Sequence, residues 1–207
     1  MIGLPWDQRL ARWLVRPLAG VRAVHPNHIT TASLLLALGA GLLFARGDMA
    51  AALWGAALFA LARFVDHADG ELARLTGQSS RLGYYYDFVV GGLSTAALFL
   101  GLGVGLGTGS VRDWPVVLGV VAAGCALIGT GLGIAVEAAS RPPDALYPSW
   151  GGFELEDGIY LIVPLTWLGW LQPFFVLSSI GQVVFCLVRL QPFFVLSSIG
   201  QVVFCLV

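Results

Sequence analysis

Residues 88–111 read FVVGGLSTAALFLGLGVGLGTGSV, a stretch that contains no charged side chain. A transmembrane α-helix needs roughly 20 consecutive apolar residues to cross the hydrocarbon core of a bilayer, and this stretch exceeds that length. The whole chain has the same character, because 57% of its 207 residues are hydrophobic and only 11% are charged. So few charges cannot cover the surface of a soluble domain. The sequence therefore predicts an integral membrane protein.

Three other segments predict further membrane-spanning helices. Residues 23–45 and 114–136 carry no formal charge, and each is long enough to cross the bilayer once. Residues 49–62 are also apolar, but at about 1.5 Å per residue they are too short to cross alone. We therefore expect this helix to continue into the charged residues that follow it.

Residues 158–188 form an apolar segment that is too long for one crossing and short for two. We expect two tightly connected helices that meet near Gly169 and Pro173, the first of them beginning inside 153–158. These two bring the count to six. The predicted fold is thus all-α, an integral membrane bundle of six transmembrane helices.

All 11 basic residues are arginine, and their positions predict the orientation of the bundle. If the N-terminus is cytoplasmic, Arg46 and Arg112 lie outside and the other nine inside, as the positive-inside rule requires. The inside set is Arg9, Arg12, Arg16, Arg22, Arg63, Arg74, Arg81, Arg141 and Arg189. Arginine without lysine, beside abundant alanine and glycine, fits a bacterial gene and hence the inner membrane. The net charge of −1 gives no basic excess that would point to nucleic acid.

The N-terminal segment 1–22 contains a predicted amphipathic helix over residues 6–16, which Pro5 can open and Pro17 can end. One side of this helix carries the apolar residues Trp6, Leu10, Trp13 and Leu14. An arginine-rich amphipathic helix with tryptophan can lie in the headgroup plane of a membrane. The alternative is an ordinary helix that packs against the bundle.

The C-terminus contains an identical repeat, because residues 171–188 read LQPFFVLSSIGQVVFCLV and residues 190–207 repeat this stretch in full. The first copy completes the six-helix domain, which we assign to residues 23–188. The second copy has no place in that plan, and could cross the membrane again, lie on its surface or be an artefact. We therefore expect residues 189–207 to lie outside the functional unit, and the site to survive their removal.

Three aspartates in or near the predicted spans mark a candidate site. Asp66 and Asp69 are three residues apart and share a helix face, while Asp87 begins the next span. Carboxylates inside a membrane are costly and are functional by default. Their oxygens suit Mg²⁺ or Mn²⁺, which bind carboxylates together with substrate phosphates, and Arg74 and Arg81 could hold the phosphates. The structural alternative is an Asp–Arg network that joins two helices.

The residues around these acids form a recognisable motif. Residues 66–74 read DHADGELAR, eight residues follow, and residues 83–87 read GYYYD. This pattern resembles the signature of the CDP-alcohol phosphatidyltransferase family, D-x-x-D-G-x-x-A-R-x8-G-x-x-x-D-x-x-x-D. Seven of its eight fixed positions are present at the right spacing. The segment 26–30, PNHIT, and the six-helix plan extend the resemblance.

The resemblance implies a membrane enzyme of phospholipid biosynthesis. Such an enzyme transfers a phosphoryl-alcohol group from a CDP-alcohol, for example CDP-diacylglycerol, to a hydroxyl acceptor and releases CMP. By the resemblance, Mg²⁺ or Mn²⁺ would be held by Asp66, Asp69 and Asp87. The substrate would be bound by Gly70, Ala73, Arg74 and Gly83, to which we add Arg81. Homodimers are common in the family, and the acceptor stays open.

The chain departs from the family at the last motif position, where Gly91 replaces the aspartate that is usually assigned as general base. A positioned base typically contributes about 10²- to 10⁴-fold to the rate of proton transfer. Alternative bases are His67, Glu71, Tyr84, Tyr85, Tyr86, Glu154, Glu156 and Asp157. Three functions therefore stay open: an active transferase, an impaired or binding-only member of the family, and a small transporter with an ion site.

Overall fold

A computed structural model describes residues 6–17, 25–108, 113–139 and 155–205, and within these ranges every regular element is a helix. The all-α prediction is confirmed. The elements are α1 (Trp6–Val15), α2 (Pro26–Ala45), α3 (Met49–Thr76), α4 (Arg81–Gly107), α5 (Trp114–Ala139), the 3₁₀ helix η2 (Leu155–Leu161), α6 (Ile162–Trp167) and α7 (Leu171–Cys205).

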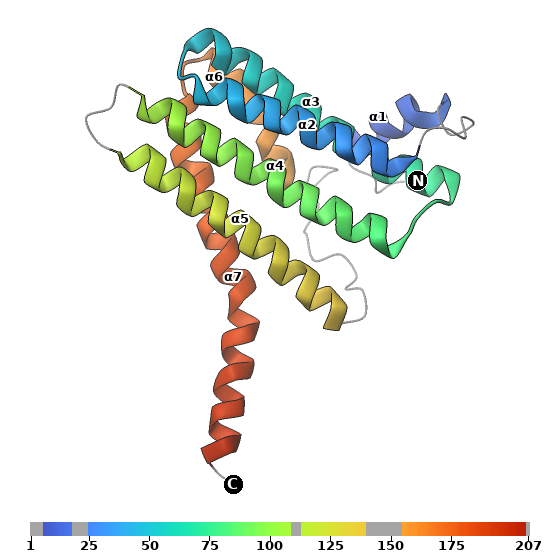
Figure 1. Ribbon diagram of the computed structural model, residues 1–207, viewed down its shortest axis with the longest axis vertical. Helices are drawn as coiled ribbons and strands as arrows, with labels where there is room; N and C mark the ends of the chain where they lie inside the picture. The colour runs from blue at the N-terminus through green and yellow to red at the C-terminus, as the bar shows by residue number, and fades with distance from the viewer. Residues whose placement is uncertain (1–5, 18–24, 109–112, 140–154, 206–207) are drawn as a thin grey trace.

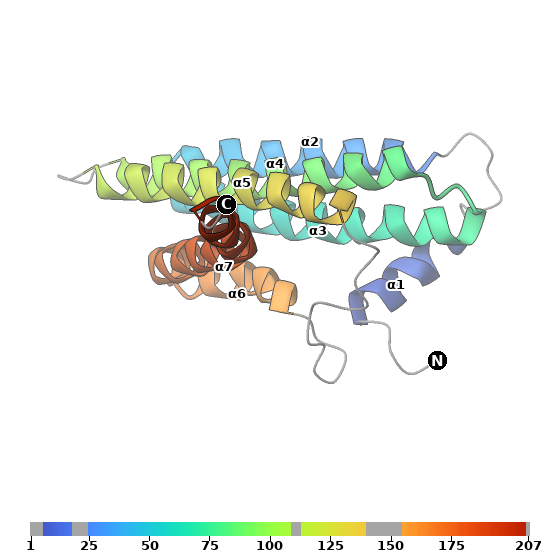
Figure 2. The ribbon, with the colours of Figure 1, turned by 90° about the horizontal axis from the view of Figure 1, so that it is seen from below.

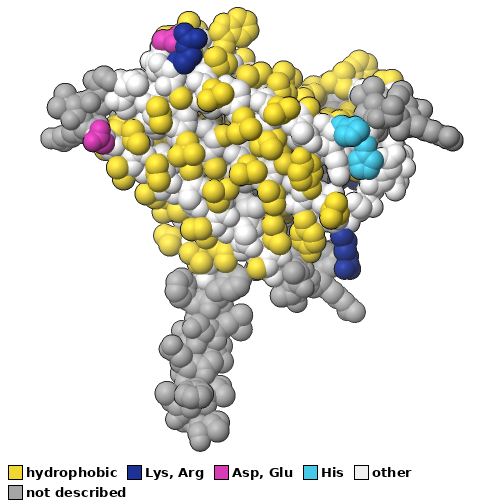
Figure 3. Space-filling model, in the orientation of Figure 1, with side chains coloured by type: hydrophobic (Ala, Val, Ile, Leu, Met, Phe, Trp, Pro, Cys, Tyr) yellow, Lys and Arg dark blue, Asp and Glu magenta, His cyan; other side chains and the backbone are white. Residues whose placement is uncertain are grey.

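Five of the described helices, α2, α3, α4, α5 and α7, are long and apolar enough to cross a membrane. On the face seen in Figure 3, hydrophobic side chains cover the helices and the charged side chains lie at the edges. The expected sixth span is a shorter apolar helix, Gly158–Trp167. It ends at a turn in which Gly169 has a φ of +75°, so the predicted junction at this residue is found. Six crossings remain a prediction, because this segment is shorter than the roughly 20 residues that a crossing requires.

Helix α2 packs against both α3 and α4. Helix α4 packs in turn against α5, and α5 against α7, while α6 lies against α3 (Figure 1). Small side chains line these contacts, and Phe44, Phe59 and Phe175 fill the larger spaces of the core. The candidate metal and substrate site lies where α2, α3 and α4 meet.

Glycines bring the backbones of α2 and α4 into direct contact. A Cβ atom on Gly101 would overlap the carbonyl oxygen of Gly41, and a Cβ on Gly41 would lie 2.7 Å from the carbonyl oxygen of Ala97. Neither obstacle is a flexible side chain that could move aside. Residues without a side chain are therefore required at this crossing, which is the usual device for close packing of membrane helices.

We expect Gly101→Ala to destabilise the protein by about 1–3 kcal/mol, because the added methyl group forces α2 and α4 apart. The matched control is Gly124→Ala on α5, where an added Cβ would meet no atom of another described element within 4 Å. That variant should be neutral or more stable by up to about 1 kcal/mol, since alanine favours helix. Thermal unfolding in detergent measures both, and equal unfolding temperatures would contradict the proposed contact.

Helix α1 packs on α3 below the bundle (Figure 2). Ala11 and Val15 are buried against Ala68 and Leu72 of α3. The other apolar side chains of α1 that the structure describes are exposed, by 43% for Leu10, 70% for Trp13 and 46% for Leu14. Helix α1 thus packs against the bundle with one face and exposes apolar side chains on another. That this face lies in the headgroup plane stays a prediction.

Helix α7 runs through both copies of the repeat without interruption, as the ribbon in Figure 1 shows. The sequence between the copies, Val188-Arg189-Leu190, contains no glycine or proline that would end a helix. At about 1.5 Å per residue, 35 residues extend about 52 Å, well beyond the roughly 30 Å of a hydrocarbon core. The second copy therefore continues α7 instead of forming a helix of its own, and its dispensability stays a prediction.

Candidate metal and substrate site

The structure brings the three predicted aspartates together. Asp66 and Asp69 lie on α3 and Asp87 on α4, and each offers a carboxylate oxygen within 4.8 Å of the other two. Asp69 is 4% exposed, whereas Asp66 and Asp87 are half-buried. Three acids that close together repel one another unless cations or hydrogen-bond donors compensate their charge.

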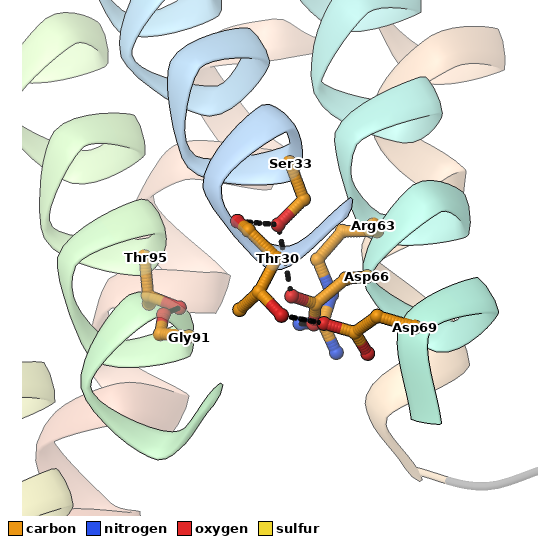
Figure 4. A network of polar contacts seen from close by, with 7 residues as sticks. All are labelled: Thr30, Ser33, Arg63, Asp66, Asp69, Gly91 and Thr95. Atoms are coloured by element: carbon orange, nitrogen blue, oxygen red, sulfur yellow. Dashed lines mark hydrogen bonds and ion pairs between the residues drawn. The ribbon is translucent and has the colours of Figure 1, made fainter. Parts of the chain in front are cut away.

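Two hydroxyl groups of α2 supply such donors, and sequence reasoning missed them. Thr30 donates a hydrogen bond to Oδ2 of Asp69, and Ser33 donates one to Oδ1 of Asp66 at 3.1 Å (Figure 4). The residues are 3% and 1% exposed. Their spacing of three residues was the available signal, because it places both side chains on one face of the helix.

A cation also contacts the cluster, although it is neither Arg74 nor Arg81. Nη1 of Arg63 lies 2.8 Å from Oδ2 of Asp66, and the two side chains are 16% and 12% exposed. Both residues belong to α3, so this ion pair does not join two helices, as the structural alternative required. Three carboxylates and one guanidinium leave a formal charge of −2 at the cluster, which a single divalent cation would neutralise.

Arg74 points toward a different acid. Its Nη2 atom lies 2.6 Å from Oε1 of Glu71, whose side chain is only 2% exposed. Oε2 of Glu71 lies 3.9 Å from Nε of Arg12 on α1. Glu71 therefore holds the motif arginine on one oxygen and faces the N-terminal helix with the other.

A cavity of about 240 Å³ opens beside the carboxylates at the ends of α2, α3 and α4. Its walls are Pro26, Asn27, Thr30, Asp69, Gly70, Ala73, Arg74, Gln78, Ser79, Ser80, Gly83, Tyr84 and Asp87. All of the predicted substrate residues are included except Arg81, which is exposed at the start of α4. The structure thus gathers all of the matching motif residues except Asp66 around one cavity.

The loop between α3 and α4 shapes the mouth of this cavity. Gly77 ends α3 with a φ of +68°, a left-handed conformation that glycine adopts without strain. Ser80 then caps α4 by accepting a hydrogen bond from the backbone N–H of Gly83 at 3.0 Å. A Cβ on Gly83 would come within 3.1 Å of that Ser80 hydroxyl and 3.3 Å of Oδ1 of Asn27. Glycine therefore keeps this wall of the cavity open.

Gly91 lies one helical turn after Asp87 on α4 and is drawn with the polar network in Figure 4. Outside its own helix backbone, a Cβ on Gly91 would meet no atom of the described residues within 4 Å, whereas a Cβ on Gly92 would overlap Thr130 of α5. The motif position thus has room for a side chain that this chain does not carry.

The structure places some of the alternative bases. Tyr84 lines the cavity, the hydroxyl of Tyr86 lies 2.9 Å from that of Thr31, and Glu71 is bound to Arg74. His67 is half-buried on α3. The acids Glu154, Glu156 and Asp157 lie outside the side chains that the structure describes.

Comparison with known proteins identifies the family. The sequence model of the CDP-alcohol phosphatidyltransferase family matches residues 23–190. No curated protein matches the sequence. The fold resembles that of Mycobacterium tuberculosis phosphatidylinositol phosphate synthase (PgsA1) in three crystal structures, each with a TM-score of 0.65.

Those structures cover nearly the whole chain. The apo form is 21% identical and aligns over 88% of this chain and 93% of its own. The form with CDP-DAG bound is 20% identical, over 90% and 92%, and the complex with manganese and citrate is 20% identical, over 89% and 87%. At such identities the likeness establishes the fold. The family match, which spans most of the chain, establishes more: the chain belongs to the CDP-alcohol phosphatidyltransferase family.

Proposed function

We propose that this protein transfers the phosphoryl-alcohol group of a CDP-alcohol to a hydroxyl acceptor and releases CMP. The observation that carries the proposal is the cluster of Asp66, Asp69 and Asp87, of which Asp69 and Asp87 line a cavity together with Arg74 and the small residues of the motif. Family membership supports the same activity. A related fold that binds CDP-DAG makes CDP-diacylglycerol the first donor to test.

The three carboxylates fit a divalent metal ion by their chemistry. Carboxylate oxygens are hard ligands that suit Mg²⁺ and Mn²⁺, and three of them lie close enough to bind one ion. When bound, the ion would neutralise the diphosphate and stabilise the departing CMP. The crystal structure of PgsA1 with manganese is consistent with such a site here.

The remaining chemistry falls to the chain's own residues. The acceptor oxygen forms a bond to the phosphorus that carries the alcohol, the bond from that phosphorus to the bridging oxygen breaks, and CMP leaves with that oxygen. Arg74, held by Glu71 at the cavity wall, would bind the phosphates. Gly70, Ala73 and Gly83 would let the nucleotide approach the helix backbones. The hydroxyl proton must go to a base, and Gly91 supplies none.

Gly91 therefore favours one alternative, a family member that binds a CDP-alcohol but transfers its group slowly. Family membership gives no support to the transporter hypothesis. From the arginine distribution we further propose that the cavity faces the cytoplasm of a bacterial cell. That the protein forms a homodimer is a further hypothesis. The acceptor is to be identified by experiment.

The activity is tested with the full-length protein in detergent or nanodiscs, supplied with CDP-diacylglycerol and a panel of acceptors. The panel contains glycerol phosphate, inositol phosphate, serine, choline and a lipid alcohol. We expect CMP release with at least one acceptor, and expect EDTA to abolish it and added Mg²⁺ or Mn²⁺ to restore it. CDP-diacylglycerol binding without CMP release would support the binding-only alternative. A protein that does not bind CDP-diacylglycerol in the presence of metal would refute the proposal.

A further inference from the structure

We propose that Thr30 and Ser33 of α2 are positioning residues, which orient the carboxylates of Asp69 and Asp66 toward a divalent cation. This inference rests on the proposed function, because it assumes that the acids bind a metal ion. Neither hydroxyl residue belongs to the family signature, and both lie on a helix that contributes no carboxylate to the cluster. Helix α2 would thus contribute to the metal site without touching the metal.

The first support is that each buried hydroxyl has two possible acceptors, a backbone carbonyl oxygen and a carboxylate. The Thr30 hydroxyl is 3.2 Å from the carbonyl oxygen of Pro26 and also bonds Asp69, and the Ser33 hydroxyl is 2.8 Å from the carbonyl oxygen of Thr30 and also bonds Asp66. Each hydroxyl has one proton. A hydrogen bond to an ionised carboxylate is roughly twice as strong as one to a neutral carbonyl, so the proton favours the carboxylate.

The second support is that such a bond leaves the carboxylate able to bind metal. Each carboxylate oxygen has two lone pairs, and a donated hydrogen bond uses only one of them. The bond fixes the rotation of the carboxylate, so that metal binding need not order it. Hydrogen-bonded partners behind metal ligands act in this way, and their loss typically costs 10- to 100-fold in metal affinity.

The two acids differ in how firmly they are held. Asp66 is held from two sides, by Ser33 on Oδ1 and by Arg63 on Oδ2. Asp69 receives its side-chain hydrogen bond from Thr30. Thr30→Val should therefore weaken metal binding by about 10- to 100-fold, and Ser33→Ala by roughly tenfold, because Asp66 keeps its bond to Arg63.

The test measures the Kd for Mn²⁺ by electron paramagnetic resonance of the free ion, with the full-length protein in nanodiscs. Thr30→Ser, which keeps the hydroxyl, should retain the wild-type Kd. Two variants remove buried hydroxyls on α6 and α7, helices that carry none of the three acids, and serve as controls. Thr166→Val deletes a hydroxyl that donates to the carbonyl oxygen of Ile162 on its own helix at 2.6 Å, and Ser179→Ala deletes one that is 0% exposed. Both controls should bind Mn²⁺ like the wild type.

An unchanged Kd in folded Thr30→Val and Ser33→Ala would overturn the inference, and so would an equal loss of affinity in Thr166→Val. Thermal unfolding without metal verifies the fold of each variant. If Thr30→Val does not fold, Ser33→Ala decides the question, since it removes only one oxygen atom. A wild-type protein that does not bind Mn²⁺ would instead refute the metal site itself, and with it the proposed function. The two failures are thus distinguishable.

Discussion

Gly91→Asp should raise the rate of CMP release at least about tenfold, because a positioned general base typically contributes about 10²- to 10⁴-fold. The residue lies one turn beyond Asp87 on α4, so a carboxylate there would share a helix face with a predicted metal ligand. Among the residues that the structure describes, no atom outside its own helix backbone lies within 4 Å of the position that its Cβ would occupy, so the backbone can accept a Cβ there. The missing base would then limit catalysis.

The experiment compares Gly91→Asp with Gly91→Asn at saturating Mg²⁺ and CDP-diacylglycerol. Asparagine has nearly the shape of aspartate but cannot accept the proton of the acceptor hydroxyl, so its rate should stay at the wild-type level. At a saturating metal concentration, a change in metal affinity does not alter the rate of CMP release, so a faster rate can be assigned to base catalysis. If Gly91→Asp binds CDP-diacylglycerol yet releases CMP no faster than the wild type, position 91 does not limit the reaction.

Asp66→Ala should abolish metal-dependent binding of CDP-diacylglycerol, with a loss of more than about 100-fold. The loss of a partner behind a metal ligand already costs 10- to 100-fold, and the loss of a ligand should cost more. The change would also remove the carboxylate that lies 2.8 Å from Arg63 and reduce the negative charge of the cluster. Binding is measured with and without Mg²⁺, because only the metal-dependent part should disappear.

Asp48→Ala is the matched control on the same helix. Asp48 caps the opposite end of α3, where the backbone N–H of Ala51 donates to its carboxylate at 2.8 Å and lowers the pKa of this exposed group. Losing the cap should cost about 1 kcal/mol of stability but leave metal-dependent binding intact. Retained metal-dependent binding in folded Asp66→Ala would count against the aspartate cluster as the metal site.

The sequence predicts the long helices and the three acids, but not the hydroxyls that contact them. Uncharged stretches reveal the long helices, because a bilayer excludes charge, and the spacing of Asp66, Asp69 and Asp87 anticipates that they meet. The hydroxyls of Thr30 and Ser33 escape notice, since small polar residues are common in membrane helices and only the packing of α2 on α3 gives them a partner.

Other features depend on which of several possible partners a charged side chain contacts, and composition does not determine that choice. The pair of Arg63 and Asp66 has the i,i+3 spacing of a helical ion pair, and was available from the sequence. Whether Arg74 faces a phosphate or an acid depends on Glu71, which becomes buried only after α3 has packed. The turn at Gly169 was predictable from residue type, and the helical segment before it begins at Leu155, inside the predicted range 153–158.

The glycine contact between α2 and α4 has a consequence at the other end of those helices. Gly41 lies 11 residues beyond Thr30 on α2, and Gly101 lies 14 beyond Asp87 on α4, so at about 1.5 Å per residue the contact is roughly 16–21 Å from the site. Direct backbone contact restricts the register, because sliding α2 by one turn would put Ala37 or Ala45 in place of Gly41 at the crossing. The glycine contact therefore fixes the position of α4 along α2, and with it the distance between Asp87 and the hydroxyls of α2.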